Sequence, residues 1–238
     1  MRRWACWKRD TAFGALGATF AGPWKKGGEI AEVTHKHPLA ILPAALLAGL
    51  VYQVSIRPTD EVVGTFVDLV RECLNLMKVI YVDERFLPSV DKMVRLTESA
   101  LRLAVDKDVS DEAAILSLGE GWTGDEAWAV SLFCAARYFD NPLQALIVAV
   151  NHDGDSDSTG SIAGNILGAV HGYEVIQGAL PPLCPPGRTL EQTLELSNLI
   201  LTLADDLASG CIISEYGELD TPEKQRWFKR YCEMIPAW

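Results

Sequence analysis

The sequence has little of what a nucleic-acid-binding or disulfide-stabilised protein needs. Its 238 residues contain 21 Lys and Arg against 32 Asp and Glu, so the net charge is −11. A protein that neutralises phosphates needs a basic face, and the shortage of basic residues therefore argues against a nucleic-acid partner. The six cysteines are widely spaced and include no C-x-x-C pair. This spacing is typical of reduced thiols and not of a small secreted domain.

Long apolar runs are also scarce. The N-terminus is basic but lacks an apolar stretch of the signal-peptide type. The most apolar segment, residues 39–56, is long enough to span a membrane, but it contains Pro43, Gly49 and Gln53. A helix that is buried on all sides fits this segment better. We therefore expect a cytoplasmic protein that has no membrane partner.

Strand signals are nearly absent, whereas helical periodicity recurs along the chain. Apolar residues repeat at three- and four-residue steps, and capping residues or prolines precede several of the apolar stretches. The expected helices cover residues 39–56, 59–77, 88–105, a short segment from 111, then 125–138, 142–150, 162–172 and 189–207. The sequence therefore predicts an all-α protein.

The charge is distributed unevenly along the chain. Residues 1–26 contain six basic residues and one acidic residue, a net charge of +5, so the remaining 212 residues carry −16. We expect three parts: a divergent basic segment over residues 1–27, a helical domain over residues 28–209, and a tail over residues 210–238 that packs on the domain.

A short acidic segment, Asn151 to Gly160, reads N-H-D-G-D-S-D-S-T-G. Its three aspartates at alternate positions supply the hard oxygen ligands that Mg²⁺, Mn²⁺ or Ca²⁺ prefer, and they repel one another unless a cation is present. The alternative is structural, with Ser158 or Thr159 capping the next helix. An EF-hand loop that begins at Asp153 is excluded. Its sixth position needs glycine but is Ser158, and its twelfth needs glutamate but is Gly164.

Glycines recur every four residues from this loop onward, at Gly160, Gly164, Gly168 and Gly172. Each glycine inside a helix costs about 1 kcal/mol relative to alanine. The four-residue period places them on one stripe of the helix. We expect the backbone of a neighbouring helix to approach this stripe closely.

The acidic loop and three further segments resemble the ADP-ribosylglycohydrolase family. T-H-K-H-P-L from Thr34 resembles the family's T-H-x-H-P segment, and L-G-E-G-W from Leu118 resembles its G-E-G-W segment. Asn151 to Gly160 matches its N-H-D-G-D-S-D-S-T-G segment at every position, and L-A-D-D-L from Leu203 resembles its closing helix. These segments occur in the family's order and span roughly residues 28–207.

The resemblance implies an orthogonal multi-helix single domain of the ADP-ribosylglycohydrolase type, with a two-metal site for Mg²⁺ or Mn²⁺. It implies hydrolysis of the glycosidic bond between ADP-ribose and a modified protein side chain or a small molecule. It assigns metal binding to Asp155, Asp157 and Ser158, and it places His35 and Trp122 in the ADP-ribose pocket. Core packing is the alternative for Trp122. The catalytic residue and the oligomeric state stay open.

Two parts of the family pattern have no counterpart upstream of Thr34. These are a second acidic cluster of the type T-D-D-T and a glycine-rich loop for the diphosphate. The only acidic residues before His35 are Asp10, Glu29 and Glu32. We therefore expect a domain that is truncated at its N-terminus and holds half of the metal site. The alternative function is an inactive remnant or an ADP-ribose-binding module.

Overall fold

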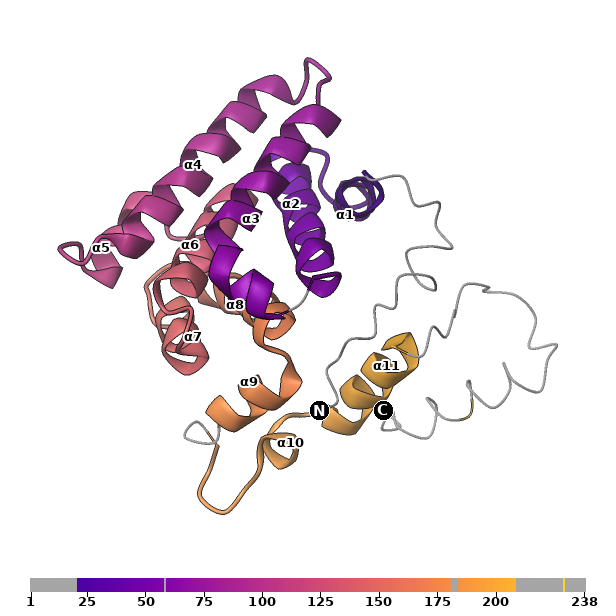
Figure 1. Cartoon of the computed structure of the whole chain (residues 1–238), viewed down its shortest axis with the longest axis vertical. Helices are drawn as coiled ribbons and strands as arrows, with labels where there is room; N and C mark the ends of the chain where they lie inside the picture. The colour runs from indigo at the N-terminus through magenta and orange to yellow at the C-terminus, as the bar shows by residue number, and fades with distance from the viewer. Residues whose placement is uncertain (1–20, 58, 181–183, 209–228, 230–238) are drawn as a thin grey trace. The chain divides into compact units, whose positions relative to one another are not determined.

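The computed structural model of the chain describes residues 21–57, 59–180, 184–208 and 229 (Figure 1). These residues form helices and no strand, so the all-α prediction is confirmed. The helices are α1 (Gly22–Glu32), α2 (Pro38–Ser55), α3 (Thr59–Ile80), α4 (Leu87–Val105), α5 (Asp111–Leu118), α6 (Gly124–Arg137), α7 (Pro142–Val150), α8 (Ser156–His171), α9 (Tyr173–Ala179), α10 (Leu190–Thr193) and α11 (Ser197–Ala208). Helices α1 to α9 lie in one compact unit, Gly17–Ala179, whereas α10 and α11 belong to another.

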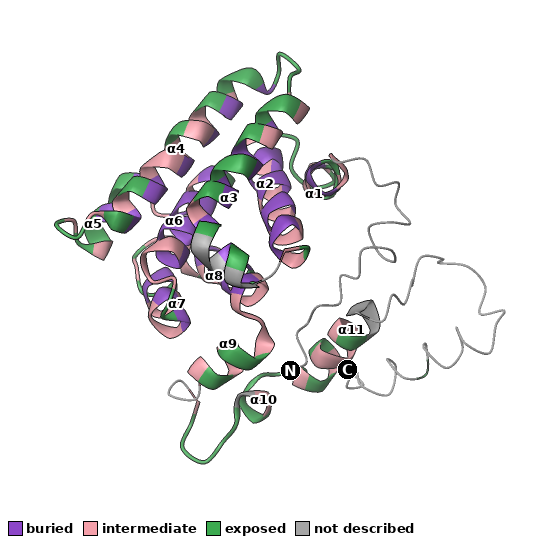
Figure 2. Cartoon of the chain, viewed as in Figure 1, coloured by how far each residue is buried: buried purple, intermediate pink, exposed green. Residues whose placement is uncertain are grey.

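Three helices, α2, α6 and α8, contact one another at the centre of the larger unit (Figure 1). Nine consecutive residues of α6, 127–135, are buried. No residue of α2 is exposed, so the prediction of a helix enclosed by the protein is confirmed (Figure 2). By length and composition α2 passes for a membrane span, as the core helix of a soluble protein also does, and half of it is buried inside the protein.

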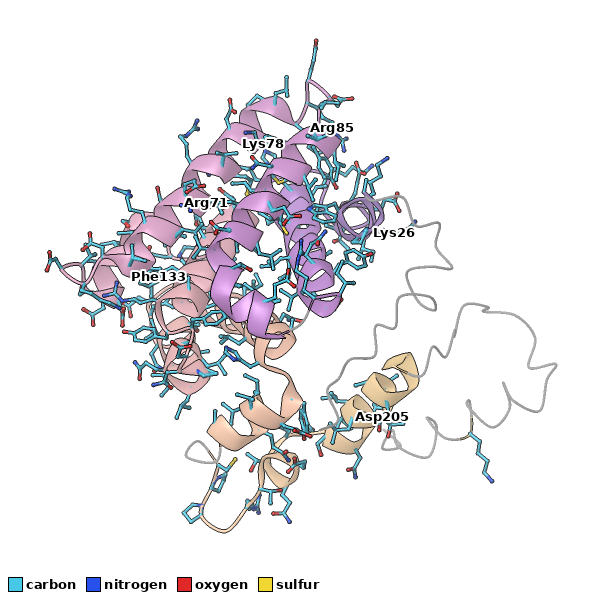
Figure 3. The ribbon with its side chains drawn as sticks, in the orientation of Figure 1. Lys26, Arg71, Lys78, Arg85, Phe133 and Asp205 are labelled. Carbon is cyan, nitrogen blue, oxygen red and sulfur yellow. The ribbon has the colours of Figure 1, made fainter. Side chains whose placement is uncertain are left out.

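Helices α3 and α4 cover this core with one apolar face each, as their three- and four-residue periodicity predicts (Figure 2). Their outer faces carry ion pairs between helices. Arg71 of α3 pairs with Glu98 of α4 at 3.1 Å. Arg85, in the turn between them, pairs with Glu32 of α1 at 2.7 Å (Figure 3). Such exposed pairs contribute little stability, and the apolar faces hold the helices in place.

Several helices begin where the sequence predicts. The side chain of Ser110 caps α5 by accepting a hydrogen bond from the backbone N–H of Ala113 at 3.2 Å. Asn141 caps α7 in the same way, and Pro142 occupies the first turn. Local capping chemistry therefore accounts for these two starts.

The sequence does not predict α1 or α9, and two of the helices that it does predict have other bounds in the structure. Helix α8 begins at Ser156, six residues before the expected start, so the end of the acidic loop is helical. The single helix expected over residues 189–207 is two helices, α10 and α11. Leu196, between them, has a left-handed φ of +57°, which ends a right-handed helix.

The first helix of the structure crosses the expected boundary after residue 27. Trp24, within the basic segment, is fully buried, and its carbonyl oxygen accepts a hydrogen bond from the Tyr81 hydroxyl at 3.1 Å. The last residues of the basic segment are therefore packed into the larger unit. Apart from Lys229, the expected tail over residues 210–238 lies outside the described residues.

Candidate functional site

Three of the segments that resemble family motifs lie at the N-terminal ends of α2, α6 and α8. The backbone of Gly124, at the start of α6, approaches the start of α2, since a methyl group on Gly124 would lie 2.7 Å from the carbonyl oxygen of Leu39. The start of α8 is joined to the turn before α6, because the backbone N–H of Asp155 donates to the carbonyl oxygen of Glu120 at 3.1 Å. The fold therefore brings these segments to one place.

The first segment begins α2. His37 is the N-cap, and its Nδ1 accepts a hydrogen bond from the backbone N–H of Leu39 at 3.1 Å. Pro38 follows in the first turn. His37 is therefore a capping residue. His35 is exposed, and its Nδ1 lies 2.9 Å from the Thr34 hydroxyl.

The second segment is a left-handed turn between α5 and α6. Gly119, Glu120 and Gly121 have φ values of +103°, +64° and +90°. Glycine adopts such angles without steric cost, whereas glutamate does not. Trp122 follows directly and is 65 % exposed, so it is not a core residue.

The third segment, the acidic loop, forms the start of α8. Asp155 is the N-cap residue but makes no side-chain capping hydrogen bond, and Asp157 and Ser158 lie in the first turn. The capping alternative for Ser158 or Thr159 is therefore wrong. The pKa of Asp157 is lowered, first by its side-chain hydrogen bond with Asp155 and then by the backbone N–H groups of Ser158 and of Asp157 itself. The two carboxyl groups therefore interact at the start of α8.

The donor set of this loop suits one hard divalent cation. The interacting carboxyl groups of Asp155 and Asp157, with the Ser158 hydroxyl one residue on, supply oxygen ligands of the kind that Mg²⁺ and Mn²⁺ accept. Within the described ranges, no group of three or more His, Cys, Asp or Glu side chains is placed to hold a metal ion. A cation bound here would keep water as most of its ligands.

The acidic loop packs directly on the left-handed turn. A methyl group on Gly154 would overlap the carbonyl oxygen of Glu120, and one on Gly121 would lie 2.8 Å from the Cγ2 atom of Thr159. Glycine at these two positions lets the two loops approach each other. The acidic loop is therefore held by backbone contact as well as by its own helix.

Sequence reasoning did not identify Thr159 as a residue of this site, except as a possible cap. Its side chain is fully buried, and its hydroxyl contacts His152 and the carbonyl oxygen of Ala149. His152 contacts Thr159 and Gly154, and neither of these contacts involves the carboxyl groups of the loop. A threonine at this place in the acidic segment carries no signal of burial, so only the fold identifies it.

In the part of the chain that the structure describes, no neighbouring backbone packs closely on the glycine stripe of α8. A methyl group on Gly160 would meet a side-chain atom of Val150 at 2.5 Å, and one on Gly164 would lie 3.8 Å from Leu146. A methyl group on Gly168 or Gly172 would meet nothing within 4 Å among the described residues. Among the described residues, the contacts at the start of α8 are with side chains of α7, so the expected approach of a neighbouring backbone is not found there.

Comparison with known proteins agrees with the sequence pattern. The model of the family described as ADP-ribosylglycohydrolase matches residues 11–215. No curated protein and no solved structure matches the chain. The family match takes in all four segments singled out above and most of the chain, including part of the basic segment. The chain therefore belongs to the ADP-ribosylglycohydrolase family.

Proposed function

We propose that this chain hydrolyses the glycosidic bond between ADP-ribose and a modified protein side chain or small molecule, with Mg²⁺ or Mn²⁺ as its cofactor. The observation that supports this most is the pair of interacting carboxyl groups, Asp155 and Asp157, at the start of α8. This pair is docked on the turn that precedes the exposed Trp122. Family membership supports the reaction class.

The carboxyl pair has the chemistry of a cation site. Two carboxylates in contact repel each other, and they share either a proton or a cation. Asp155 and Asp157 would hold the ion, with Ser158 as a third ligand. When bound, such an ion polarises substrate oxygens and activates water.

The surroundings of the pair suit an anionic, aromatic ligand. The N-cap residues of α6 and α8, Thr123 and Asp155, make no side-chain capping hydrogen bond. The helix dipoles at these ends favour a negatively charged group such as a diphosphate. Trp122, which is exposed, offers a flat face for a base to stack on, and His35 lies exposed before α2.

The experiment is release of ADP-ribose from an arginine-linked substrate with Mg²⁺ or Mn²⁺. Asp155→Asn should lower kcat/KM by more than about 100-fold, the upper end of the loss when outer-sphere partners of a metal are removed. Asp153→Asn is the matched control, because Asp153 is exposed in the same loop and loses the same charge. Turnover that survives both EDTA and Asp155→Asn would contradict the proposal.

The second candidate is a module that binds ADP-ribose without cleaving it. The absence of a third acidic, His or Cys ligand beside the pair, in the part of the chain that the structure describes, favours this alternative. Calorimetric titration with ADP-ribose, run beside the assay, separates the two. Binding that is weakened by Trp122→Ala, without turnover by the wild type, supports the binding module.

A further inference from the structure

The Thr159 hydroxyl is the most connected buried side-chain group at the start of α8. It lies 2.6 Å from the carbonyl oxygen of Ala149, in the last turn of α7, and 2.9 Å from Nε2 of His152. The carbonyl oxygens of Asp155 and Ser156 are farther away, at 3.1 and 3.2 Å. Thr159 therefore connects the end of α7, the acidic loop and the first turn of α8.

These hydrogen bonds have a fixed direction. The backbone N–H of Gly154 donates to Nδ1 of His152 at 3.1 Å, so Nδ1 carries no proton. In a neutral ring the proton is then on Nε2, which donates to the Thr159 hydroxyl. A hydroxyl has one hydrogen, and the nearest acceptor for it is the carbonyl oxygen of Ala149. The result is a series of hydrogen bonds, each donated by one residue to the next, that runs from Gly154 through His152 and Thr159 to Ala149.

This series of hydrogen bonds connects the two ends of the acidic loop. It joins Gly154, which precedes the N-cap Asp155, to residues on both sides of the loop. The backbone N–H of Thr159 also donates to the carbonyl oxygen of Asp155 at 3.1 Å. The backbone positions from which Asp155 and Asp157 project are therefore set by His152 and Thr159, although neither side chain adds a carboxylate.

We propose that His152 and Thr159 are positioning residues, which hold Asp155 and Asp157 in the arrangement that lets both carboxylates reach one divalent cation. The inference rests on the proposed function. Each member of the series is the partner of the next, so loss of either side chain breaks the same connection. The two residues therefore act as a unit, and their effects on cation binding should not add.

The test is the affinity for Mn²⁺, measured by electron paramagnetic resonance with the full chain. Thr159→Val, which keeps the shape and removes the hydroxyl, should weaken Mn²⁺ binding by about 10–100-fold. Thr159→Ser keeps the hydroxyl and should restore binding to within about threefold. His152→Gln should weaken binding, and adding it to Thr159→Val should cause little further loss. His152 is half-buried, so this variant remains informative if Thr159→Val does not fold.

The matched control is Ser131→Ala. Ser131 is also fully buried, and its hydroxyl lies 2.6 Å from the carbonyl oxygen of Ala127 and 2.9 Å from that of Thr159, but it is not part of the series. This variant loses a buried hydroxyl at the same place and should bind Mn²⁺ as the wild type does. Equal losses in Ser131→Ala and Thr159→Val, or no rescue by Thr159→Ser, would overturn the inference in favour of simple packing.

A second measurement separates this inference from the proposed function. The ¹H–¹⁵N spectrum of the His152 ring at neutral pH should show a proton on Nε2 and none on Nδ1. A proton on Nδ1 would overturn the positioning series and leave the proposed function intact. A wild-type chain that binds no Mn²⁺ would instead overturn the proposed function, and the inference with it.

Discussion

Two groups of glycines in this protein have opposite surroundings. Gly121, in the turn before α6, and Gly154, in the acidic segment, lie where a methyl group would collide with an atom of the other segment. Those along the second half of α8, Gly164 and Gly168, lie where a methyl group would make an ordinary contact or meet nothing within 4 Å among the described residues. In the sequence, the regular stripe of α8 is the more conspicuous of the two groups. In the structure, the irregular loop glycines are the ones that build the site.

The difference shows what a glycine pattern does and does not indicate. A four-residue period places glycines on one helix face, but the period alone does not say that a backbone lies against that face. Close approach depends on what the fold brings there. At Gly154 it is the carbonyl oxygen of Glu120, from a turn that lies more than thirty residues earlier in the chain. Substitution by alanine measures this difference directly.

The largest effect is expected for Gly154→Ala. The added methyl group would overlap the carbonyl oxygen of Glu120, which is backbone and cannot rotate away. The loops must separate, with loss of the hydrogen bond from Asp155 to Glu120. We expect a loss of about 3 kcal/mol in the free energy of unfolding, from overpacking and the lost bond together. Urea unfolding followed by circular dichroism measures it. An unchanged midpoint would show that the loops are not in contact.

A smaller loss is expected for Gly121→Ala. Alanine at a φ of +90° is strained, and the methyl group would lie 2.8 Å from the Cγ2 atom of Thr159. We expect a loss of about 2 kcal/mol in the free energy of unfolding. Urea titration again measures this loss. Glu120→Gly is the control in the same turn, because it relieves a left-handed residue and should stabilise by about 1 kcal/mol. Equal losses in both variants would mean that backbone conformation is not the cause.

Much of the fold follows from local signals in the sequence. The periodicity of α3 and α4 and the caps at Ser110 and Asn141 identify helices that the structure confirms. The break at Leu196 has no such signal, because leucine periodicity continues through it without glycine or proline. Local propensity favours one long helix there, and only the backbone conformation shows two.

The candidate site is predicted less completely than the fold. Composition identifies the acidic loop as a place for oxygen ligands, and the resemblance to the family assigns Asp155, Asp157 and Ser158; these assignments stay predictions. The meeting of three helix starts and the burial of Thr159 depend on contacts between distant parts of the chain. No spacing in the sequence encodes such contacts, so the support of the loop is visible only in three dimensions.

The smallest effect, and one of opposite sign, is expected for Gly168→Ala. A methyl group there meets nothing within 4 Å in the described structure, and alanine favours the helix by about 1 kcal/mol. Gly164→Ala is the matched variant, with an ordinary contact of 3.8 Å to Leu146 and the same expected gain. Urea unfolding at several protein concentrations measures both. A loss of stability for Gly168→Ala alone would mean that another surface covers this face of α8 in solution. A loss that appears only at high concentration would identify that surface as a second copy of the chain, because only self-association depends on protein concentration.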